Sequence, residues 1–226
     1  MPDTIAAIRA RTPFFSSTVR RIQEAGTDSL AHFGNGYLLE GGYSLQQNPD
    51  EFAALVHLLQ ERCGLLWVRR GLVRPFYLEI GSASGGTLRL LHEMIGFPVT
   101  RSMDNHGHHR WLEQEENWRQ LNVEAFVGDS HSQEAKDWLA SKYDTQVLKG
   151  PTVAFIDGDH SYEGVTLDVQ LVRPHLQPGS VVIFHDTVAC DGVKRAFEEA
   201  TAWAALVANY VGEGYRPLGI GVLEVM

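Results

Sequence analysis

Aspartate and histidine side chains gather in two short segments in the second half of the chain. Asp157-Gly-Asp-His160 and His185-Asp186 each directly follow a short apolar run. Carboxylate and imidazole groups are suitable donors for one divalent cation, so Asp157, His185 and Asp186 are predicted to bind a metal ion. A bound cation lowers the pKa of a substrate hydroxyl and orients it for attack. His160 and Asp157 are predicted to be catalytic, with His160 as the general base, because an ordinary imidazole titrates near pH ~6.5.

Each of these groups also has a purely structural alternative. Asp159 or Ser161 can cap the helix that follows, and His185 can bind a backbone group. The set as a whole favours function over capping.

A glycine-rich turn follows an earlier apolar run and reads Glu79-Ile-Gly-Ser-Ala-Ser-Gly-Gly-Thr87. Gly81 lets the backbone pass close beneath a ligand, and Gly85 relaxes the entry into the next helix. The dinucleotide fingerprint is G-x-G-x-x-G, whereas the spacing here is G-x-x-x-G-G, and the acid in front repels a pyrophosphate. The turn therefore favours a cationic or neutral nucleoside, the alternative being an ordinary strand-to-helix turn.

Acidic residues also stand at the ends of the next two predicted strands. Asp104 ends one of them, where an acid can accept hydrogen bonds from ribose hydroxyls. Gly128-Asp129-Ser130 ends the other, and Asp129 is predicted to accept from the exocyclic amine of a base. A turn or helix cap is the alternative at each position. Acids at the ends of three consecutive strands nevertheless favour a nucleoside site.

Two further groups of reactive side chains receive no catalytic role. His106, His108 and His109 follow Asp104 in a predicted loop, where a solvated loop or the rim of a cofactor site is favoured over a second metal site. Cys190 lies in the loop after His185-Asp186, and nothing in the sequence supplies it with a partner.

Short apolar runs alternate with helix-like stretches from residue 76 onward. The runs cover 76–80, 99–103, 123–127, 152–156 and 181–184, and the helical patterns cover 86–96, 110–121, 132–143, 161–173 and 192–208. This alternation predicts an α/β fold with a doubly wound, Rossmann-like sheet. Two late strands, at 210–211 and 219–225, form a predicted hairpin that adds one antiparallel strand to a seven-stranded, mostly parallel sheet. Upstream, Asn48 is predicted to cap a helix that begins at Pro49.

The composition excludes several classes of protein. The chain has 226 residues, of which 44% are hydrophobic and 21% charged, as in soluble globular proteins. Acidic residues outnumber basic ones by 28 to 19, and the net charge of −9 opposes binding to nucleic acid. No apolar run approaches the ~20 residues that cross a bilayer, so the sequence predicts no membrane association and a cytoplasmic location. Cys63 and Cys190 are predicted to remain thiols.

The motifs resemble those of class I S-adenosylmethionine-dependent methyltransferases. Glu79-Ile-Gly-Ser-Ala-Ser-Gly-Gly is similar to their first motif, and the C-terminal hairpin to their antiparallel seventh strand. Three later segments resemble a bacterial subgroup that includes O-methyltransferases of macrolide sugars and proteins named for cephalosporin hydroxylation: Phe155-Ile-Asp-Gly-Asp-His-Ser-Tyr-Glu-Gly-Val165, Gly179-Ser-Val-Val-Ile-Phe-His-Asp-Thr187 and Gly192-Val-Lys-Arg-Ala196. The resemblance covers about residues 42–226 and implies a methyltransferase domain at 46–226. The weakly patterned residues 1–45 are predicted to form an N-terminal arm or lid.

The resemblance also assigns roles to individual residues, with S-adenosylmethionine as the cofactor. Its methionine part would contact the first motif, its ribose Asp104 and its adenine Asp129 and Ser130. The cofactor-binding set implied in this way is Glu79, Gly81, Ser82, Ala83, Gly85, Thr87, Asp104, Asp129 and Ser130. In related catechol O-methyltransferases, magnesium ligands match Asp157, His185 and Asp186, and a lysine base stands where this chain has His160. Because a histidine replaces a carboxylate at 185, manganese, iron or the absence of a metal is admitted beside magnesium.

The leading hypothesis is methyl transfer from S-adenosylmethionine to an oxygen of a small polar molecule. An N-terminal arm with apolar residues favours a homodimer. One alternative is an iron-dependent oxygenase that uses Asp157, His160 and His185 as a two-histidine, one-carboxylate set. The other is a nucleoside-binding protein without turnover. The acceptor is not fixed by the fold.

Overall fold

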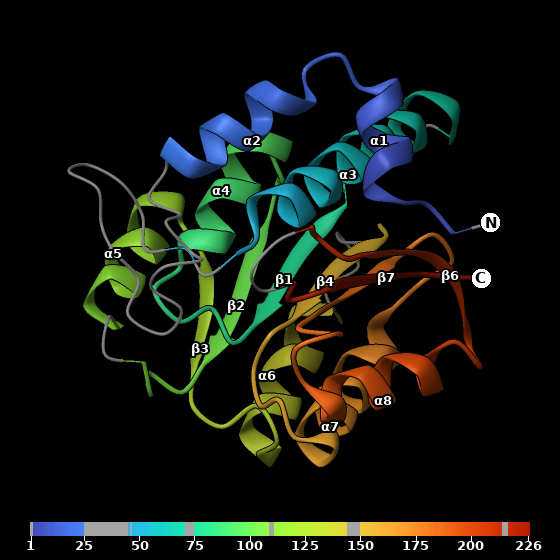
Figure 1. Cartoon of the computed structure of the whole chain (residues 1–226). Helices are drawn as coiled ribbons and strands as arrows, with labels where there is room; N and C mark the ends of the chain where they lie inside the picture. The colour runs from blue at the N-terminus through green and yellow to red at the C-terminus, as the bar shows by residue number, and fades with distance from the viewer. Residues whose placement is uncertain are drawn as a thin grey trace.

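A single seven-stranded sheet forms the centre of the computed structural model, which describes residues 2–24, 45, 47–70, 75–108, 111–143, 150–213 and 217–226 (Figure 1). The strand order is β3-β2-β1-β4-β5-β7-β6, and the strands from β3 to β5 run parallel. The strands are β1 (Phe76–Ile80), β2 (Thr100–Asp104), β3 (Glu124–Val127), β4 (Thr152–Ile156), β5 (Val181–His185), β6 (Ala204–Tyr210) and β7 (Ile220–Val225).

Helices cover both faces of the sheet (Figure 1). One layer contains α3 (Pro49–Arg70), α4 (Gly86–Ile95) and α5 (Trp111–Leu121), and the opposite layer contains α6 (Gln133–Tyr143), α7 (Tyr162–Val172) and α8 (Asp191–Ala200). A short 3₁₀ helix, η1 (Arg173–His175), follows α7. The prediction of a doubly wound α/β fold is therefore confirmed.

Alternate residues of the central strands pack into two separate cores, one on each face of the sheet. On β4, Val153 and Phe155 belong to the core under α3 and α4, whereas Ala154 and Ile156 belong to the core under α7 and α8. Successive side chains of a strand point to opposite faces, and here both faces are dry. This double burial explains why the strands read as unbroken apolar runs.

The C-terminal hairpin supplies the antiparallel part of the sheet. β7 pairs antiparallel with both β5 and β6, as predicted. The helix predicted over 192–208 is wrong in its second half, because α8 ends at Ala200 and residues 204–210 form β6. Alanine-rich sequence has a high helix propensity, but pairing with β7 and burial of Ala204 and Ala208 decide the local structure.

The N-terminal segment packs against α3. Its two helices are α1 (Ile5–Arg11) and α2 (Phe15–Glu24), and both bury apolar side chains, Ile8, Phe15 and Ile22, in the core that contains α3. Residues 25–44 lie outside the described part of the chain. The division into an arm at 1–45 and a domain at 46–226 stays a prediction. Within the described residues, no helix combines the length and the apolar character needed to cross a membrane.

The helix α3 begins as predicted at Pro49. The side chain of Asn48 caps it, because its Oδ1 accepts from the backbone N–H groups of Asp50 (3.0 Å) and Glu51 (3.3 Å). The buried carboxylate of Glu51 in turn accepts from the backbone N–H groups of Gly212 (2.7 Å) and Gly219 (3.0 Å). Through Glu51, α3 fixes the β6–β7 connection at the same sheet edge as the candidate site.

Candidate active site

The candidate site lies at the carboxyl ends of the parallel strands, where the strand order reverses between β1 and β4. Ligands of open α/β sheets bind at such a switch point. A cavity of about 420 Å³ opens there, lined by residues that follow four strands, among them Gly81, Asp104, Asp129 and Asp157. Four of the residues predicted at or next to strand ends, Gly81, Asp104, Asp129 and Asp157, therefore meet at one cavity.

The floor of this cavity requires a glycine at position 81. Gly81 has φ +80°, and a Cβ there would lie 2.5 Å from the carbonyl carbon of Asp157 and 2.6 Å from Cα of Gly158. The backbones of the β1 and β4 ends thus approach more closely than any side chain allows. Gly81 sets the position of Asp157 as well as the space for a ligand.

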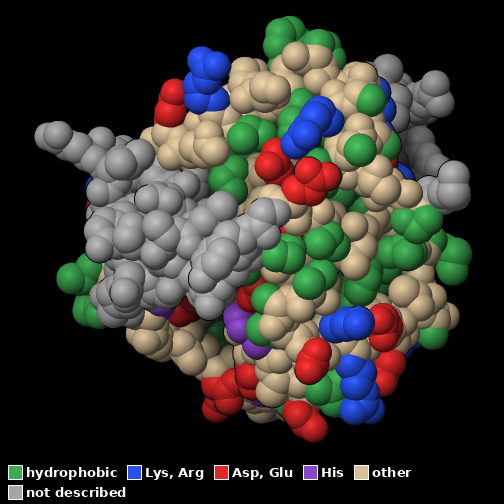
Figure 2. All heavy atoms as spheres, in the orientation of Figure 1, with side chains coloured by type: hydrophobic (Ala, Val, Ile, Leu, Met, Phe, Trp, Pro, Cys, Tyr) green, Lys and Arg blue, Asp and Glu red, His purple; other side chains and the backbone are tan. Residues whose placement is uncertain are grey.

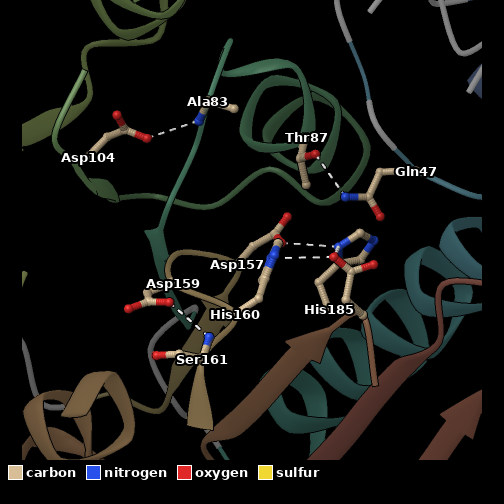
Figure 3. Close-up of polar contacts among 10 residues, drawn as sticks. Gln47, Ala83, Thr87, Asp104, Asp157, Asp159, His160, Ser161 and His185 are labelled. Atoms are coloured by element: carbon tan, nitrogen blue, oxygen red, sulfur yellow. Dashed lines mark hydrogen bonds and ion pairs between the residues drawn. The ribbon is translucent and has the colours of Figure 1, made fainter. Parts of the chain in front are cut away.

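Asp104 is held by the turn that it faces. Its Oδ2 accepts from the N–H of Ala83 (3.0 Å; Figure 3), and its Oδ1 accepts from the N–H of His106 (2.7 Å). Ala83 has φ +49° and His106 has φ +56°, so two left-handed residues direct their N–H groups to one carboxylate. The carboxylate is fixed at the cavity wall, where an acid can accept from ribose hydroxyls.

Asp129 and Ser130 occupy the far end of the same cavity. The side chain of Asp129 is 70% exposed, whereas the Ser130 hydroxyl donates to Oδ1 of Asp168 on α7 (2.7 Å). His131 Nε2 also lies 3.2 Å from this Oδ1. Burial raises the pKa of Asp168 to about 6, with smaller opposite contributions from Ser130 and His131. Asp168, which the sequence did not reveal, positions Ser130 and His131 beside the cavity.

A smaller hollow of about 30 Å³ adjoins the cavity and contains Glu79, Thr87, Asp157 and Gln47. Glu79 is 1% exposed and accepts from the hydroxyl of Tyr77 (2.8 Å). Its burial, together with the charges of Asp157 and Asp104, raises the pKa of Glu79 well above its ordinary value despite that hydrogen bond. A cation in this hollow would stabilise the ionised carboxylate.

Gln47 is a second acceptor in this hollow that the sequence analysis did not identify. Its Nε2 donates to Oγ1 of Thr87 (3.2 Å; Figure 3), and its buried Oε1 has no hydrogen-bond partner among the described residues. A buried amide oxygen without a partner is costly, and a ligand N–H removes that cost. Gln47 and Glu79 together suit an ammonium group.

Two residues of the predicted cofactor set serve the turn itself. The Ser82 hydroxyl lies 2.7 Å from that of Ser102 and accepts from Nε2 of Gln114 (2.9 Å). Gly85 has φ +77° and precedes the first residue of α4. Asn117 braces the turn by donating to the carbonyl of Ser84 (2.9 Å). Ser82 and Gly85 therefore shape the loop, while its backbone remains near the ligand space.

An acid–imidazole cluster lies beside the smaller hollow. His185 Nδ1 is 3.1 Å from Oδ1 of Asp157 and 3.5 Å from Oδ2 of Asp186, and His160 Nε2 is 3.3 Å and 3.4 Å from the same two oxygens (Figure 3). The His185 and Asp186 side chains are buried, whereas that of His160 is 42% exposed. Figure 2 shows some histidine side chains at the surface of this face of the molecule. The exposures of the individual side chains mean that the cluster is closed at His185 and Asp186 and open to solvent at His160.

The charges of this cluster are mutually dependent. Burial of the His185 ring opposes its protonation, but Asp157 and Asp186 outweigh burial and raise the pKa of His185 well above its ordinary value. The hydrogen bond to Asp157, aided by the charge of Asp186, also raises the pKa of His160. In return, although burial opposes it, the two imidazoles lower the pKa of Asp157. The carboxylates therefore hold positive charge between them.

The donor atoms fit a divalent cation. One ligand atom each from Asp157, His185 and Asp186 lie within 4.8 Å of one another. Asp186 has φ +63°, a conformation that Asp tolerates, and its buried Oδ1 has no hydrogen-bond partner within the described ranges. Two carboxylates and one imidazole suit manganese or iron at least as well as magnesium. A cation here would take the place of the imidazolium proton.

The histidine-rich loop after β2 takes part in the cavity wall. His106 stacks against Trp111 and Trp118 with ring centroids 5.5 and 5.4 Å apart, and His108 lines both the cavity and the smaller hollow. His109 lies outside the described residues. His108 therefore lies at the cavity wall, and the role of this histidine-rich loop stays a prediction.

Comparison with known proteins agrees with this geometry. Residues 78–187, which run from β1 to just beyond β5, match a family model described as a methyltransferase domain. No curated protein shows significant sequence similarity to the chain.

Solved methyltransferase structures share the fold. The O-methyltransferase TomG from Streptomyces achromogenes, in complex with S-adenosylmethionine, is 16% identical over 94% of both chains, with a TM-score of 0.59. An O-methyltransferase from Bacillus cereus, in complex with S-adenosylhomocysteine, is 17% identical over 97% of this chain and 99% of that one, with a TM-score of 0.57. The N-methyltransferase NodS from Bradyrhizobium japonicum is 14% identical over 92% and 98%, with a TM-score of 0.51. The chain therefore shares the fold of these methyltransferases, and its residues 78–187 match a methyltransferase domain.

Proposed function

We propose that the protein transfers the methyl group of S-adenosylmethionine to an oxygen of a small polar acceptor. The observation that carries this proposal is the position of Asp157, which lines the cofactor cavity and its smaller hollow and also belongs to the acid–imidazole cluster. A sulfonium methyl group bound in the cavity would face the cluster across this one residue.

The cavity offers a partner for each part of the cofactor. Gln47 and Glu79 would accept from the methionine ammonium, Asp104 from the ribose hydroxyls and Asp129 from the adenine amine. The ammonium supplies the positive charge that the buried Glu79 carboxylate needs. Ser130, held by Asp168, would close the adenine end.

The acid–imidazole cluster would prepare the acceptor. Asp157, His185 and Asp186 would hold a divalent cation, which supplies Lewis acidity that lowers the pKa of the acceptor hydroxyl. Nε2 of His160 would accept the hydroxyl proton while the oxygen bonds to the methyl carbon and the carbon–sulfur bond breaks. The products are the methyl ether and S-adenosylhomocysteine. His160 must be neutral for this role, and the charge of a nearby cation favours the neutral imidazole.

The iron-oxygenase alternative receives less support. Among the described residues, the sets whose ligand atoms lie within 4.8 Å of one another are Asp157–His185–Asp186 and His160–Asp186–Cys190. The two-histidine, one-carboxylate set is not one of them. That alternative also leaves the nucleoside cavity without a purpose.

Calorimetric titration with S-adenosylhomocysteine tests the proposal. We expect one site per chain, and Asp104→Ala should weaken it about tenfold or more, because a hydrogen bond to a charged group contributes about 1.5–3 kcal/mol. Glu134→Ala, at an exposed acid of α6 away from the cavity, should leave affinity unchanged. Absence of binding by the wild-type protein at millimolar ligand would remove the basis for the proposal.

A further inference from the structure

A second ligand set overlaps the acid–imidazole cluster and has different chemistry. His160, Asp186 and Cys190 each contribute a ligand atom, and these three atoms lie within 4.8 Å of one another. The set shares Asp186 with the Asp157–His185–Asp186 set but adds a thiol. Cys190 is not in a disulfide, since both cysteines are free.

The backbone holds these three residues together. The N–H of Cys190 donates to the carbonyl of Asp186 (2.9 Å), which closes the turn between β5 and α8. The N–H groups of Val188 and Ala189 donate to the carbonyl of Leu218 (2.9 and 3.1 Å), which ties this turn to the segment before β7. The thiol and the carboxylate are therefore presented from one braced loop.

Close packing of α8 brings His160 to that loop. A Cβ on Gly192, in the first turn of α8, would lie 2.5 Å from the carbonyl oxygen of His160 and 2.6 Å from the nitrogen of Tyr162. Only glycine permits this approach of the α8 start to the β4–α7 connection. The fold therefore holds the backbone of the β4–α7 connection close to the loop that carries Asp186 and Cys190.

One buried carboxylate oxygen of this ligand set also lacks a hydrogen-bond partner among the described residues. Asp186 is 3% exposed, and its Oδ1 makes no hydrogen bond within the described ranges, although its Oδ2 lies 3.4 Å from His160 Nε2. Buried carboxylate oxygens without a partner are costly. A cation bound at this point would satisfy Asp186.

We propose that His160, Asp186 and Cys190 form a site for a thiophilic divalent ion such as Zn²⁺ or Co²⁺. Thiolate, imidazole and carboxylate are the donors of three-ligand zinc sites, with a fourth position left to water. The exposed side of His160 leaves room for that water. Binding releases the thiol proton of Cys190 to solvent and forms the metal–sulfur bond.

A metal ion bound by His160, Asp186 and Cys190 would prevent the catalytic arrangement in which His160 is the base. This consequence rests on the proposed function. A Zn²⁺ ion would occupy the His160 lone pair that should accept the substrate proton, and it would draw Asp186 away from the other ligand set. Mg²⁺ and Mn²⁺ prefer oxygen-rich sets, whereas Zn²⁺ prefers sets that include sulfur. Zinc is therefore inferred to be an inhibitory ion for this protein.

Cobalt absorption spectroscopy on the full-length protein tests the site without an acceptor. Co²⁺ should give a near-ultraviolet thiolate-to-metal charge-transfer band in the wild type and in Cys63→Ala, the matched control at the other cysteine. Cys190→Ser should lose the band. The inference is overturned if Co²⁺ does not bind, if it binds without this band, or if the band persists in Cys190→Ser.

Alkylation of the wild-type protein covers the case in which Cys190→Ser does not fold. Zn²⁺ should slow iodoacetamide modification of Cys190, followed by mass spectrometry, at least tenfold, and His160→Asn should reduce this protection. An unchanged rate would contradict the site. Titration with S-adenosylhomocysteine is scored separately, so that failure of the metal site and failure of the methyltransferase proposal are distinguished.

Discussion

Replacing Gly81 by alanine should lower both the stability of the protein and its affinity for the cofactor. The substitution has two unfavourable effects, one on the backbone conformation and one on packing. A non-glycine residue in the left-handed conformation costs about 1–2 kcal/mol. The added Cβ would also lie 2.5 Å from the Asp157 carbonyl carbon, and overpacking costs about 1–3 kcal/mol. The free energy of unfolding should therefore fall by about 2–5 kcal/mol. Since the contact is with backbone, relief requires movement of Asp157 itself.

Gly179→Ala provides the matched control. Gly179 has φ +88°, but a Cβ there would meet nothing within 4 Å, so only the conformational cost of about 1–2 kcal/mol applies. Urea unfolding of both variants and calorimetric titration with S-adenosylhomocysteine give the comparison. We expect Gly179→Ala to bind normally and Gly81→Ala to bind weakly or not at all. Equal losses of stability together with equal binding would refute the close approach of the β1 and β4 ends.

Three further predictions concern single side chains of the site. Gln47→Ala should weaken S-adenosylhomocysteine binding about tenfold or more by calorimetry, since a hydrogen bond to the charged ammonium contributes about 1.5–3 kcal/mol; unchanged affinity would place Gln47 outside the ligand contacts. His160→Ala should lower turnover about 10²–10⁴-fold, measured as S-adenosylhomocysteine release with an identified acceptor, while cofactor affinity persists; full turnover would exclude His160 as the base. Asp168 faces Ser130, His131 and Asp159, and burial raises its pKa to about 6. Because this pKa is above the ordinary value, Asp168 stabilises the native state at low pH, and the free energy of unfolding falls by about 3 kcal/mol as pH rises through 6. Asp168→Asn should remove this pH dependence in urea unfolding, and identical pH profiles would contradict it.

The central strands β1, β4 and β5 were predictable because both of their faces are buried. β1 and β4 begin and end at the predicted residues. A short apolar run bounded by glycine, proline or an acidic residue predicts a buried strand with few alternatives. The second half of the 192–208 segment was not predictable from local sequence, because its strand conformation depends on pairing with β7. The apolar residues of the N-terminal arm include Ile8 and Ile22, which α1 and α2 bury in the core that contains α3.

Site residues were predictable from the sequence only where they lie at or directly after the end of a strand. Asp104 and Asp157 directly end or follow strands, so topology alone brings them to one edge of the sheet. Gln47 meets Thr87 across 40 positions and Asp168 meets Ser130 across 38, and neither pair carries a local signal. Such partners come from the packing of helices α3 and α7 on the sheet. Sequence periodicity does not encode that packing in a readable form.

A crystal structure with S-adenosylhomocysteine and Mn²⁺ bound would show whether one site holds both the cofactor and the metal ion. We expect the adenosine in the cavity beside Asp104 and Asp129, with the sulfur directed toward Asp157. We also expect an anomalous manganese peak between Asp157, His185 and Asp186. Density for the nucleoside away from this cavity, or manganese bound without Asp157, would contradict the proposed function.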